Sequence, residues 1–305
     1  MKECECAAGD CVYEHLKIES LREVCCKHSR SVNLDAVKDY KVLLVGDGIY
    51  DRYVFVSALG KSIKDPIISL KAESEEIYRG GAWAAGAHLN TLCDVVDVST
   101  SPFTMNNTRF LETVYKRKLF TVHEPQHEEK GRDYEIGDYD VVIVLDFGHG
   151  TMTKELIERV TKEAKFLAVN TQTNSQNYGF NVITKYPRAD YVVLDELEAR
   201  LAVHDNQSPI EDVILKLGYQ KLVVTLGANG ALGYDGEFHR ENARAREIVD
   251  TTGAGDAFIA CSAPFAAAGF PMKDLVRIGN AAGAVKLGIL GHRRAVTKTD
   301  LEALL

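Results

Sequence analysis

The sequence contains no long run of apolar residues. The roughly eighteen consecutive apolar residues that a membrane-spanning helix requires occur nowhere together. The first residues, Met1 to Cys6, also lack the apolar core of a secretory signal peptide. We therefore expect a cytoplasmic protein that does not cross a membrane.

Positive charge is scarce as well. The chain carries 36 Lys and Arg residues against 44 Asp and Glu residues, which gives a formal net charge of −8. The densest basic cluster, residues 116–118, is short and is flanked by apolar side chains. A surface that binds nucleic acid or an anionic membrane normally carries an excess of basic groups. The composition therefore argues against both kinds of partner.

Proline is limited to seven residues, whereas 46% of the residues are hydrophobic. This composition indicates a globular chain and not a disordered one. At 305 residues the chain is long enough to bury a sizeable core, as one large α/β domain or as two small ones.

Cysteine is unevenly distributed along the chain. Five of the seven lie in the first 26 residues, at Cys4, Cys6, Cys11, Cys25 and Cys26. A metal site or a redox pair is one interpretation of this crowding. Two well-spaced Cys-x-x-Cys pairs are absent, and adjacent cysteines match no common zinc pattern, which favours free thiols. The remaining two, Cys93 and Cys261, have apolar neighbours typical of a core.

The commonest glycine-rich nucleotide motifs are absent. Gly227 and Gly230 are not followed by Lys-Ser or Lys-Thr, so the chain has no P-loop. No Gly-x-Gly-x-x-Gly follows the first predicted strand, at 41–45, which disfavours a Rossmann dinucleotide site.

What the chain does contain is a series of short apolar runs that alternate with helical patterns. The runs cover residues 41–45, 140–145, 166–169, 190–194 and 222–226, and the helical patterns cover 83–92, 153–164, 257–268 and 274–287. Without a sequence repeat, this alternation predicts a parallel sheet covered by helices on both faces. Residues 124–138 are charged and poor in apolar side chains, which predicts a surface loop.

Residues 1–40 differ from the rest and are predicted to form a helical appendage. The apolar side chains between Tyr13 and Cys25 approximate one face of a helix, and residues 35–40 suit a second short helix. No catalytic pattern is visible there. We expect this segment to pack on the main domain or on a second copy.

The chemistry is concentrated in residues 249–260. Gly253, Ala254 and Gly255 leave their backbone N–H groups unobstructed, and the apolar run that follows predicts a helix. N–H groups at a helix N-terminus bind anions because they lack partners within the helix and lie at the positive end of its dipole. Asp256, in the same first turn, adds a carboxylate that could act as a base in phosphoryl transfer to a hydroxyl. A tight turn with a capping Asp is the alternative.

The run Asp-Thr-Thr-Gly-Ala-Gly-Asp at 250–256 resembles the C-terminal signature of the ribokinase-like (PfkB) carbohydrate kinases. Gly-Asp-x-x-x-Asp-Arg-Tyr at 46–53 and Asp-Phe-Gly-His-Gly at 146–150 resemble elements of the bacterial heptose-phosphate kinases in that family. The resemblance implies a kinase domain over 41–305 with a three-layer α/β sandwich and a mostly parallel sheet. It also implies a small β-lid, from about residues 53–70 and 107–123, through which such proteins often form homodimers.

The resemblance further implies a reaction, in which the γ-phosphoryl group of ATP passes to a hydroxyl of a sugar or sugar phosphate. Asp256 would be the general base, and the N–H groups of residues 253–255 would form the anion hole. The other implied roles are nucleotide binding by Thr225, Gly227, Gly230 and Asn280, acceptor binding by Asp51, Gly80, Gly81 and Arg109, Mg²⁺ binding by Asp195 and Glu198, and binding of a monovalent cation such as K⁺ by Asp250 and Thr252.

Several of these residues also have simpler interpretations. Asp51 suits an Asx-type turn, and Arg109 suits an exposed edge strand. Asp195 and Glu198 would be favoured in the first turn of any helix.

The sequence departs from the heptose-kinase pattern at four places. Ala84 replaces an expected Asn, His149 replaces a Lys, Gln172 lies where the family often has Asp-Pro-Lys, and Arg293 with Arg294 interrupts the segment near the cation site. These changes leave open another acceptor, such as a nucleoside or a ketose phosphate, and a non-catalytic sugar- or nucleotide-binding protein on the same fold. No His-x-Gly-His motif is present, so a nucleotidyltransferase activity would have to come from a separate partner.

Overall fold

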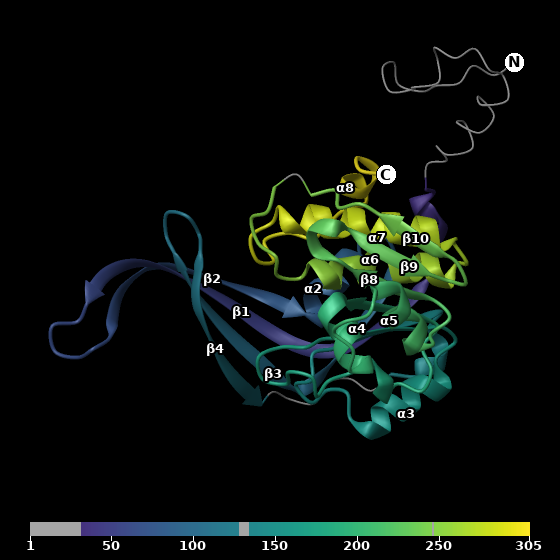
Figure 1. Ribbon diagram of the computed structural model, residues 1–305, viewed down its shortest axis with the longest axis horizontal. Helices are drawn as coiled ribbons and strands as arrows, with labels where there is room; N and C mark the ends of the chain where they lie inside the picture. Colours follow the sequence, from purple (N-terminus) through teal and green to yellow (C-terminus); the bar gives the residue numbers. More distant parts are fainter. Residues whose placement is uncertain (1–31, 128–133, 246) are drawn as a thin grey trace, which may run out of the picture.

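A computed structural model of the protein describes residues 32–127, 134–245 and 247–305 and contains a ten-stranded sheet. In chain order the strands are β1 (Lys41–Lys61), β2 (Ile68–Gly81), β3 (Val95–Glu112), β4 (Lys118–His127), β5 (Val141–Asp146), β6 (Leu167–Thr171), β7 (Tyr191–Asp195), β8 (Leu222–Thr225), β9 (Ala231–Tyr234) and β10 (Phe238–Glu241). Their order across the sheet is β10-β9-β8-β7-β6-β5-β1-β3-β4, and β2 pairs with β1 outside this path (Figure 1).

The middle of the sheet is parallel. The first part of β1 pairs with β3 and β5, and the parallel pairing continues from β5 to β8. Residues 42–45 and 141–146 are buried without alternation, because helices cover both faces of these strands. The predicted parallel, doubly covered sheet is therefore confirmed.

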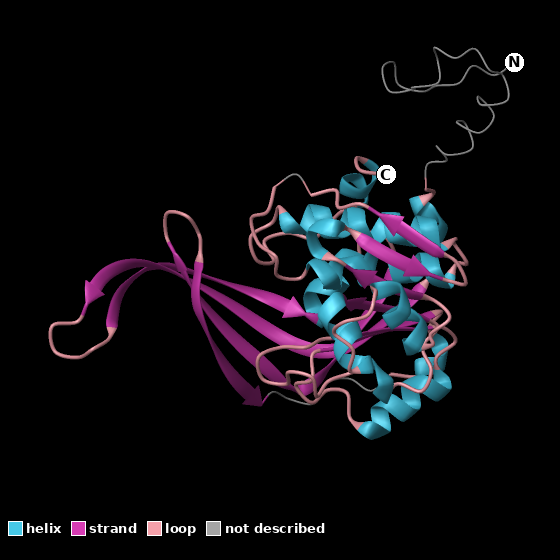
Figure 2. Ribbon diagram, viewed as in Figure 1, coloured by secondary structure: helices cyan, strands magenta, loops and turns pink. Residues whose placement is uncertain are grey.

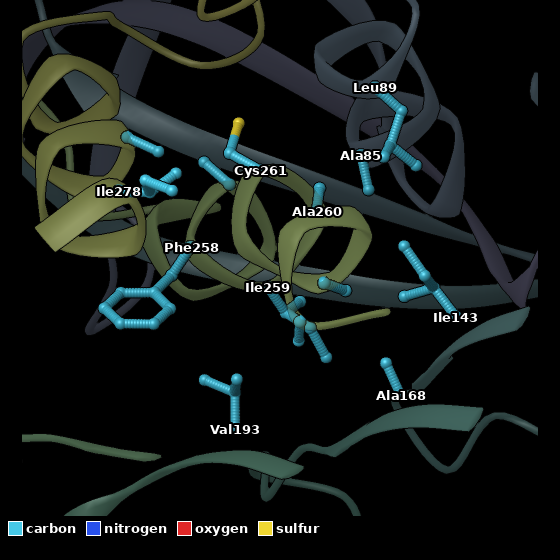
Figure 3. Close-up of a cluster of buried hydrophobic side chains, with 14 of the residues drawn as sticks. Ala85, Leu89, Ile143, Ala168, Val193, Phe258, Ile259, Ala260, Cys261 and Ile278 are labelled. Atoms are coloured by element: carbon cyan, nitrogen blue, oxygen red, sulfur yellow. The ribbon is translucent and has the colours of Figure 1, made fainter. Parts of the chain in front are cut away.

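Helices form a layer on each face of the sheet. One layer contains α2 (Ala82–Leu89), α6 (Ala254–Ala267) and α7 (Met272–Leu287), and the other contains α3 (Lys154–Glu163), α4 (Glu196–Val203) and α5 (Ile210–Leu217). Side chains on β1 alternate between the two cores, because Leu44 packs in the first and Leu43 in the second. Figure 3 shows α6 between Ile278 of α7 and the sheet residues Ala168 and Val193.

Four strands extend beyond the helix-covered part of the molecule. We call this projection, residues 48–81 and 104–127, the lid; it contains the predicted lid segments 53–70 and 107–123. Beyond a register irregularity between Gly46 and Gly48, β1 runs on between β2 and β3 (Figure 2). A small core of Tyr53, Phe55, Leu111 and Leu290 joins the lid to the C-terminal segment.

Short elements complete the fold. They are the 3₁₀ helices η1 (Leu34–Val37), η2 (Ile136–Asp138), η3 (Ile183–Lys185) and η4 (Gly227–Asn229), and the terminal helix α8 (Lys298–Glu302). None of the helices in the described ranges is both long and apolar enough to cross a membrane.

Two predictions about local structure need correction, and a third falls on residues that the structure does not describe. The predicted loop at 124–138 is wrong at its start, because β4 continues to His127 by pairing with β3, which satisfies the backbone of a polar strand. The helix predicted at 35–40 is a 3₁₀ turn, held by Leu34 and Val37 in the core. The helix predicted between Tyr13 and Cys25, and the five N-terminal cysteines, lie outside the described residues. Cys93 and Cys261 are buried as predicted.

Candidate active site

Two neighbouring cavities lie at the carboxyl ends of the parallel strands, where ligands bind in open α/β sheets. We call the first, of about 380 Å³, the inner cavity and the second, of about 770 Å³, the outer cavity. Both are lined by Asp195, Thr225, Thr251, Ala254 and Gly255. The glycine loop at 253–255 therefore lies at the junction of two spaces that could hold two different ligands.

The loop leads directly into α6. Gly253 precedes the helix in the left-handed conformation, with φ of 78°, which favours glycine. The N–H of Ala257 donates to Gly253 O over 3.0 Å, so the N–H groups of residues 254–256 precede the first helical hydrogen bond. This is the geometry of an anion site at a helix N-terminus.

Asp256 lines the inner cavity from the first turn of α6. Its side chain is buried, and Gln172 Nε2 donates to its Oδ1 over 2.5 Å. Burial raises the pKa of the Asp256 carboxyl, although the charge of His292 and the Gln172 hydrogen bond act in the opposite direction. A carboxylate with a raised pKa accepts a proton more readily, which suits a general base.

Asp51 is the centre of a second polar group, where the lid meets the sheet. Its buried carboxylate accepts from Arg109 at Oδ1, and His292 Nε2 lies 3.1 Å from Oδ2. Burial alone would raise the pKa of Asp51, but the His292 hydrogen bond and the Arg109 charge lower it overall, so the group is held as a carboxylate. Nδ1 of His292 is buried with no hydrogen-bond partner in the described part of the chain.

The paired glycines of β2 make this arrangement possible. A Cβ on Gly80 would collide with Asp51 Oδ2, so Gly80 allows the close approach of β2 to that carboxylate. Gly81 has φ of 57° and lines the inner cavity together with Asp51, Arg109 and His292.

Two histidines and an asparagine line another part of the inner cavity. His123 Nδ1 lies 2.6 Å from Asn107 Oδ1. The loop that carries His149 is held by buried Asp47, which accepts from the backbone N–H groups of Phe147 and His149 over 3.0 and 3.2 Å. Burial lowers the pKa of His149, against the charge of Asp47.

Asp195 and Glu198 form a capping box at the start of α4. Glu198 N donates to Asp195 Oδ1 over 2.7 Å, and Asp195 N donates to Glu198 Oε2 over 2.8 Å. Burial, with the charge of Asp195, raises the pKa of Glu198 to about 8, and burial also raises the pKa of Asp195. The two side chains therefore lie at the start of a helix, as the simpler interpretation of the sequence predicts, and they also line the inner cavity.

The outer cavity is lined largely by small and apolar residues. Gly227 and Gly230 adopt positive φ values of 56° and 80°, and Leu226 N donates to Gly230 O over 2.8 Å to close the turn after β8. Asn280 and Gly283 line the opposite side from α7, where Asn280 Nδ2 donates to Asn242 O over 2.6 Å. A space lined by small and apolar side chains suits a flat ring such as a nucleotide base.

Asp250 and Thr252 lie at the start of the same loop and contact an amino group from the lid. Lys118 Nζ is 2.7 Å from both Asp250 Oδ1 and Thr252 Oγ1. Tyr53 OH and Gly291 N donate to Asp250 Oδ2 over 2.8 and 2.9 Å. The position that the resemblance gives to a monovalent cation is therefore taken by the Lys118 ammonium.

Residues 104–298, more than half of the chain, match the pfkB family of carbohydrate kinases. The chain belongs to this family. Relatives of this pfkB kinase include the bifunctional protein HldE of Campylobacter jejuni, 26% identical over an alignment of 290 residues that covers 82% of this chain and 62% of that protein. HldE of Hyphomonas neptunium is 30% identical over an alignment of 173 residues that covers 54% of this chain and 35% of that one. The pfkB kinase chain therefore spans less than two thirds of the length of these relatives.

Solved structures show the same fold. Ribokinase from Thermotoga maritima superposes with a TM-score of 0.65 at 16% identity, over 87% of this chain and 99% of that one. Ribokinase from Arabidopsis thaliana, solved with ribose and ATP, superposes with a TM-score of 0.63 at 16% identity, over 87% and 98% of the two chains. The predicted family, the pfkB carbohydrate kinases, and the ribokinase-like fold are confirmed.

The structure brings most of the predicted site residues of this pfkB kinase around the two cavities, whereas their roles stay predictions. Two predicted residues, Gly80 and Asp250, do not line the inner cavity. Gly80 lies behind Asp51, which does line it, and Asp250 contacts Lys118 and Tyr53. Sequence reasoning missed His292, His123 and Lys118 as members of the site. His292 and Lys118 are brought in by contacts across 241 and 132 positions, and His123 is placed by the pairing of β4 with β3, so none of them follows a motif spacing. Only His149 carried a signal, as the replacement for an expected Lys.

Proposed function

We propose that this chain transfers the γ-phosphoryl group of ATP to a hydroxyl of a sugar or sugar phosphate held in the inner cavity. The observation that supports this most strongly is the glycine loop between the two cavities, with Asp256 in the inner one. ATP in the outer cavity would direct its terminal phosphate at the loop. An acceptor in the inner cavity would then approach that phosphate from the opposite side, as in-line transfer requires.

In the proposed reaction, Asp256 accepts the proton of the acceptor hydroxyl as its oxygen bonds to the γ-phosphorus. The bond from that phosphorus to the β–γ bridging oxygen breaks, and ADP leaves. The N–H groups of residues 253–256 stabilise the negative charge on the transferring group. Gln172, through its hydrogen bond to Oδ1, holds the Asp256 carboxylate in place.

The nucleotide would lie against Thr225, Gly227, Gly230 and Asn280 in the outer cavity. Asp195 and Glu198 would hold Mg²⁺, whose charge would offset that of the ATP phosphates. The fit is supported by the raised pKa values of both carboxyls, because a nearby cation would relieve the burial of two adjacent acids. Two carboxylates leave other positions to water and phosphate oxygens, which is the coordination that Mg²⁺ favours.

The acceptor would contact Asp51, Gly81, Arg109 and His292. Asp51 can accept hydrogen bonds from sugar hydroxyls, and the unpaired Nδ1 of His292 faces no competing partner in the described residues. Arg109 brings a guanidinium to the same cavity, and the rings of His123 and His149 can donate hydrogen bonds there, which favours an acceptor that already carries a phosphate.

We further propose two assembly properties. The curated relatives are named bifunctional, and residues 1–305 contain no His-x-Gly-His motif, so a nucleotidyltransferase would act beside this kinase as a partner. The lid would form a homodimer, because it carries exposed apolar side chains at Leu59, Ile63, Ile67, Ile68, Ile77, Phe120 and Val122. Its edge strand β2 pairs only with β1 within the described residues, which leaves an edge that a second copy can cover.

The test is release of ADP, with ATP and Mg²⁺ present, against a panel of free and phosphorylated pentoses, hexoses and heptoses, ketose phosphates and nucleosides. Turnover on a sugar phosphate, with product phosphorylation shown by mass spectrometry, would support the proposal. Turnover confined to nucleosides would show that the acceptor is a nucleoside and not a sugar or sugar phosphate. ATP binding without turnover on any acceptor would instead favour a binding protein on the kinase fold.

A further inference from the structure

The place where family resemblance puts a monovalent cation does not fit a free ion in this structure. Asp250 Oδ1 accepts from Lys118 Nζ over 2.7 Å and from Thr252 N over 3.0 Å. Asp250 Oδ2 accepts from Tyr53 OH and from Gly291 N. Both oxygens of a carboxylate that is 1% exposed are thus occupied by hydrogen-bond donors, and Thr252 Oγ1 contacts the same ammonium.

Lys118 reaches this position from the lid. It is the first residue of β4 and lies 132 positions before Asp250 in the sequence. Its side chain is 34% exposed, and its amino group ends against the segment that leads into the glycine loop at residues 253–255, which we call the anion loop. The positive charge at the loop is therefore supplied by a different part of the chain from the loop itself.

A second ammonium lies close by. Lys286, near the end of α7, is fully buried, and its Nζ donates to the backbone oxygen of Gly291 over 2.8 Å. A Cβ placed on Gly253 would lie 3.3 Å from Lys286 Cε, so this side chain ends beside the anion loop. Gly291 links Lys286 to Asp250, because its carbonyl accepts from Lys286 and its N–H donates to the carboxylate that Lys118 also contacts.

An ion bound at a site of this kind is the largest local charge in it and raises the positive potential of the neighbouring N–H groups. An ammonium at the same place has the same charge but is fixed to the chain. A third cation would have to displace Lys118 from two oxygens and would be repelled by both lysines.

We propose that Lys118 and Lys286 supply, as tethered cations, the charge that a monovalent metal ion would bring to the anion loop, so that turnover needs no K⁺. Lys118 acts as a positioning residue, because it contacts Asp250 and Thr252 and not the reacting atoms. The inference rests on the proposed phosphoryl transfer for its kinetic part, and the lid thereby takes part in building the phosphate site.

The experiment compares the full chain and its Lys118→Ala variant in buffers of equal ionic strength containing K⁺, Na⁺ or tetramethylammonium. The wild type is expected to have the same kcat in all three. Lys118→Ala should lose at least about tenfold in kcat with little change in the KM for ATP, because charge at the anion loop acts on the transition state. K⁺ or methylammonium should restore part of that loss with saturation. Arg117→Ala removes the same charge one residue away and should behave as the wild type.

Thermal unfolding gives a second measurement that needs no acceptor. The wild type should show no K⁺-specific rise in Tm over Na⁺, whereas Lys118→Ala should gain one, because the emptied position can then bind the ion. Lys118→Met, which keeps the apolar stem, tests the same point if the Ala variant does not fold. Several-fold activation of the wild type by K⁺, a K⁺-specific Tm rise in the wild type, or unchanged kcat in Lys118→Ala would overturn the inference. If no acceptor is turned over but only Lys118→Ala shows a K⁺-specific rise in Tm, the proposed reaction would be wrong and the inference about Lys118 would stand.

Discussion

At the scale of single residues, Glu198 shows how one side chain can serve both the fold and the site. It closes the capping box of α4 and also accepts from Thr173 N over 3.1 Å, so it ties α4 to the loop after β6. Its carboxyl is buried beside that of Asp195, and this raises its pKa to about 8. In the absence of a cation, an ionised Glu198 therefore lowers the stability of the folded state, because burial beside Asp195 favours the protonated acid.

The raised pKa predicts how stability depends on pH. Between the ordinary pKa of 4.5 and about 8, the folded state keeps a proton on Glu198 that the unfolded state has lost. Stability falls with rising pH wherever the folded state binds more protons, so this group should lower the free energy of unfolding as the pH rises from about 5 to about 8. Glu198→Gln should flatten that part of the curve, measured by urea unfolding without Mg²⁺ at several pH values.

Glu158→Gln, on the exposed face of α3, removes the same charge without burial and should leave the curve unchanged. Adding Mg²⁺ should raise the stability of the wild type most at the alkaline end, where Glu198 loses its proton most readily and the ion has least to displace. A wild-type curve that matches Glu198→Gln throughout this range would contradict the assigned pKa.

At the scale of elements, the N-terminus of α6 depends on one backbone conformation. Gly253 has φ of 78°, and a Cβ there would lie 3.0 Å from His292 Cε1. Gly255, two residues on, is inside the helix, and a Cβ there would point into open space. Gly253 is therefore required by the left-handed turn, whereas Gly255 keeps the cavity wall free of a side chain.

Gly253→Ala and Gly255→Ala form a matched pair. The first forces a side chain into the left-handed region at about 1–2 kcal/mol, which predicts a fall in Tm of roughly 2–8 °C. The second replaces a helical glycine and should leave Tm unchanged or raise it, by up to about 1 kcal/mol of stability. Calorimetry of both variants decides the matter, and equal Tm values would show that the left-handed turn does not constrain the loop.

At the scale of the whole molecule, the parallel core and the anion loop could be predicted, because apolar runs and a glycine-Asp motif are local patterns. The antiparallel edge β9–β10 and helix α5 were not predicted, since they are short and gain their stability from neighbours. Contacts between distant segments were also beyond reach. Asp51 contacts His292, 241 positions away, and Lys118 contacts Asp250, 132 positions away, and no sequence spacing predicts either contact.

The projecting lid leads to a prediction about assembly. Ile68 and Ile77 on β2 are 67% and 60% exposed, and burying them against a second copy would be favourable. Replacing both with Lys should convert the dimer to a monomer, as measured by light scattering after gel filtration. Phe180→Lys, at a residue that is 91% exposed outside the lid, is the control. A wild type that is monomeric at micromolar concentration would disprove lid-mediated dimerisation.

The central claim is that Asp256 deprotonates the acceptor at the junction of the two cavities. The most direct measurement is kcat of Asp256→Asn, with the acceptor found in the panel, beside equilibrium binding of ATP. We expect kcat to fall by about 10²–10⁴-fold, because a positioned base contributes on that order, while ATP still binds. Asp39→Asn, at an exposed position, should match the wild type. Near-wild-type turnover by Asp256→Asn would contradict the account.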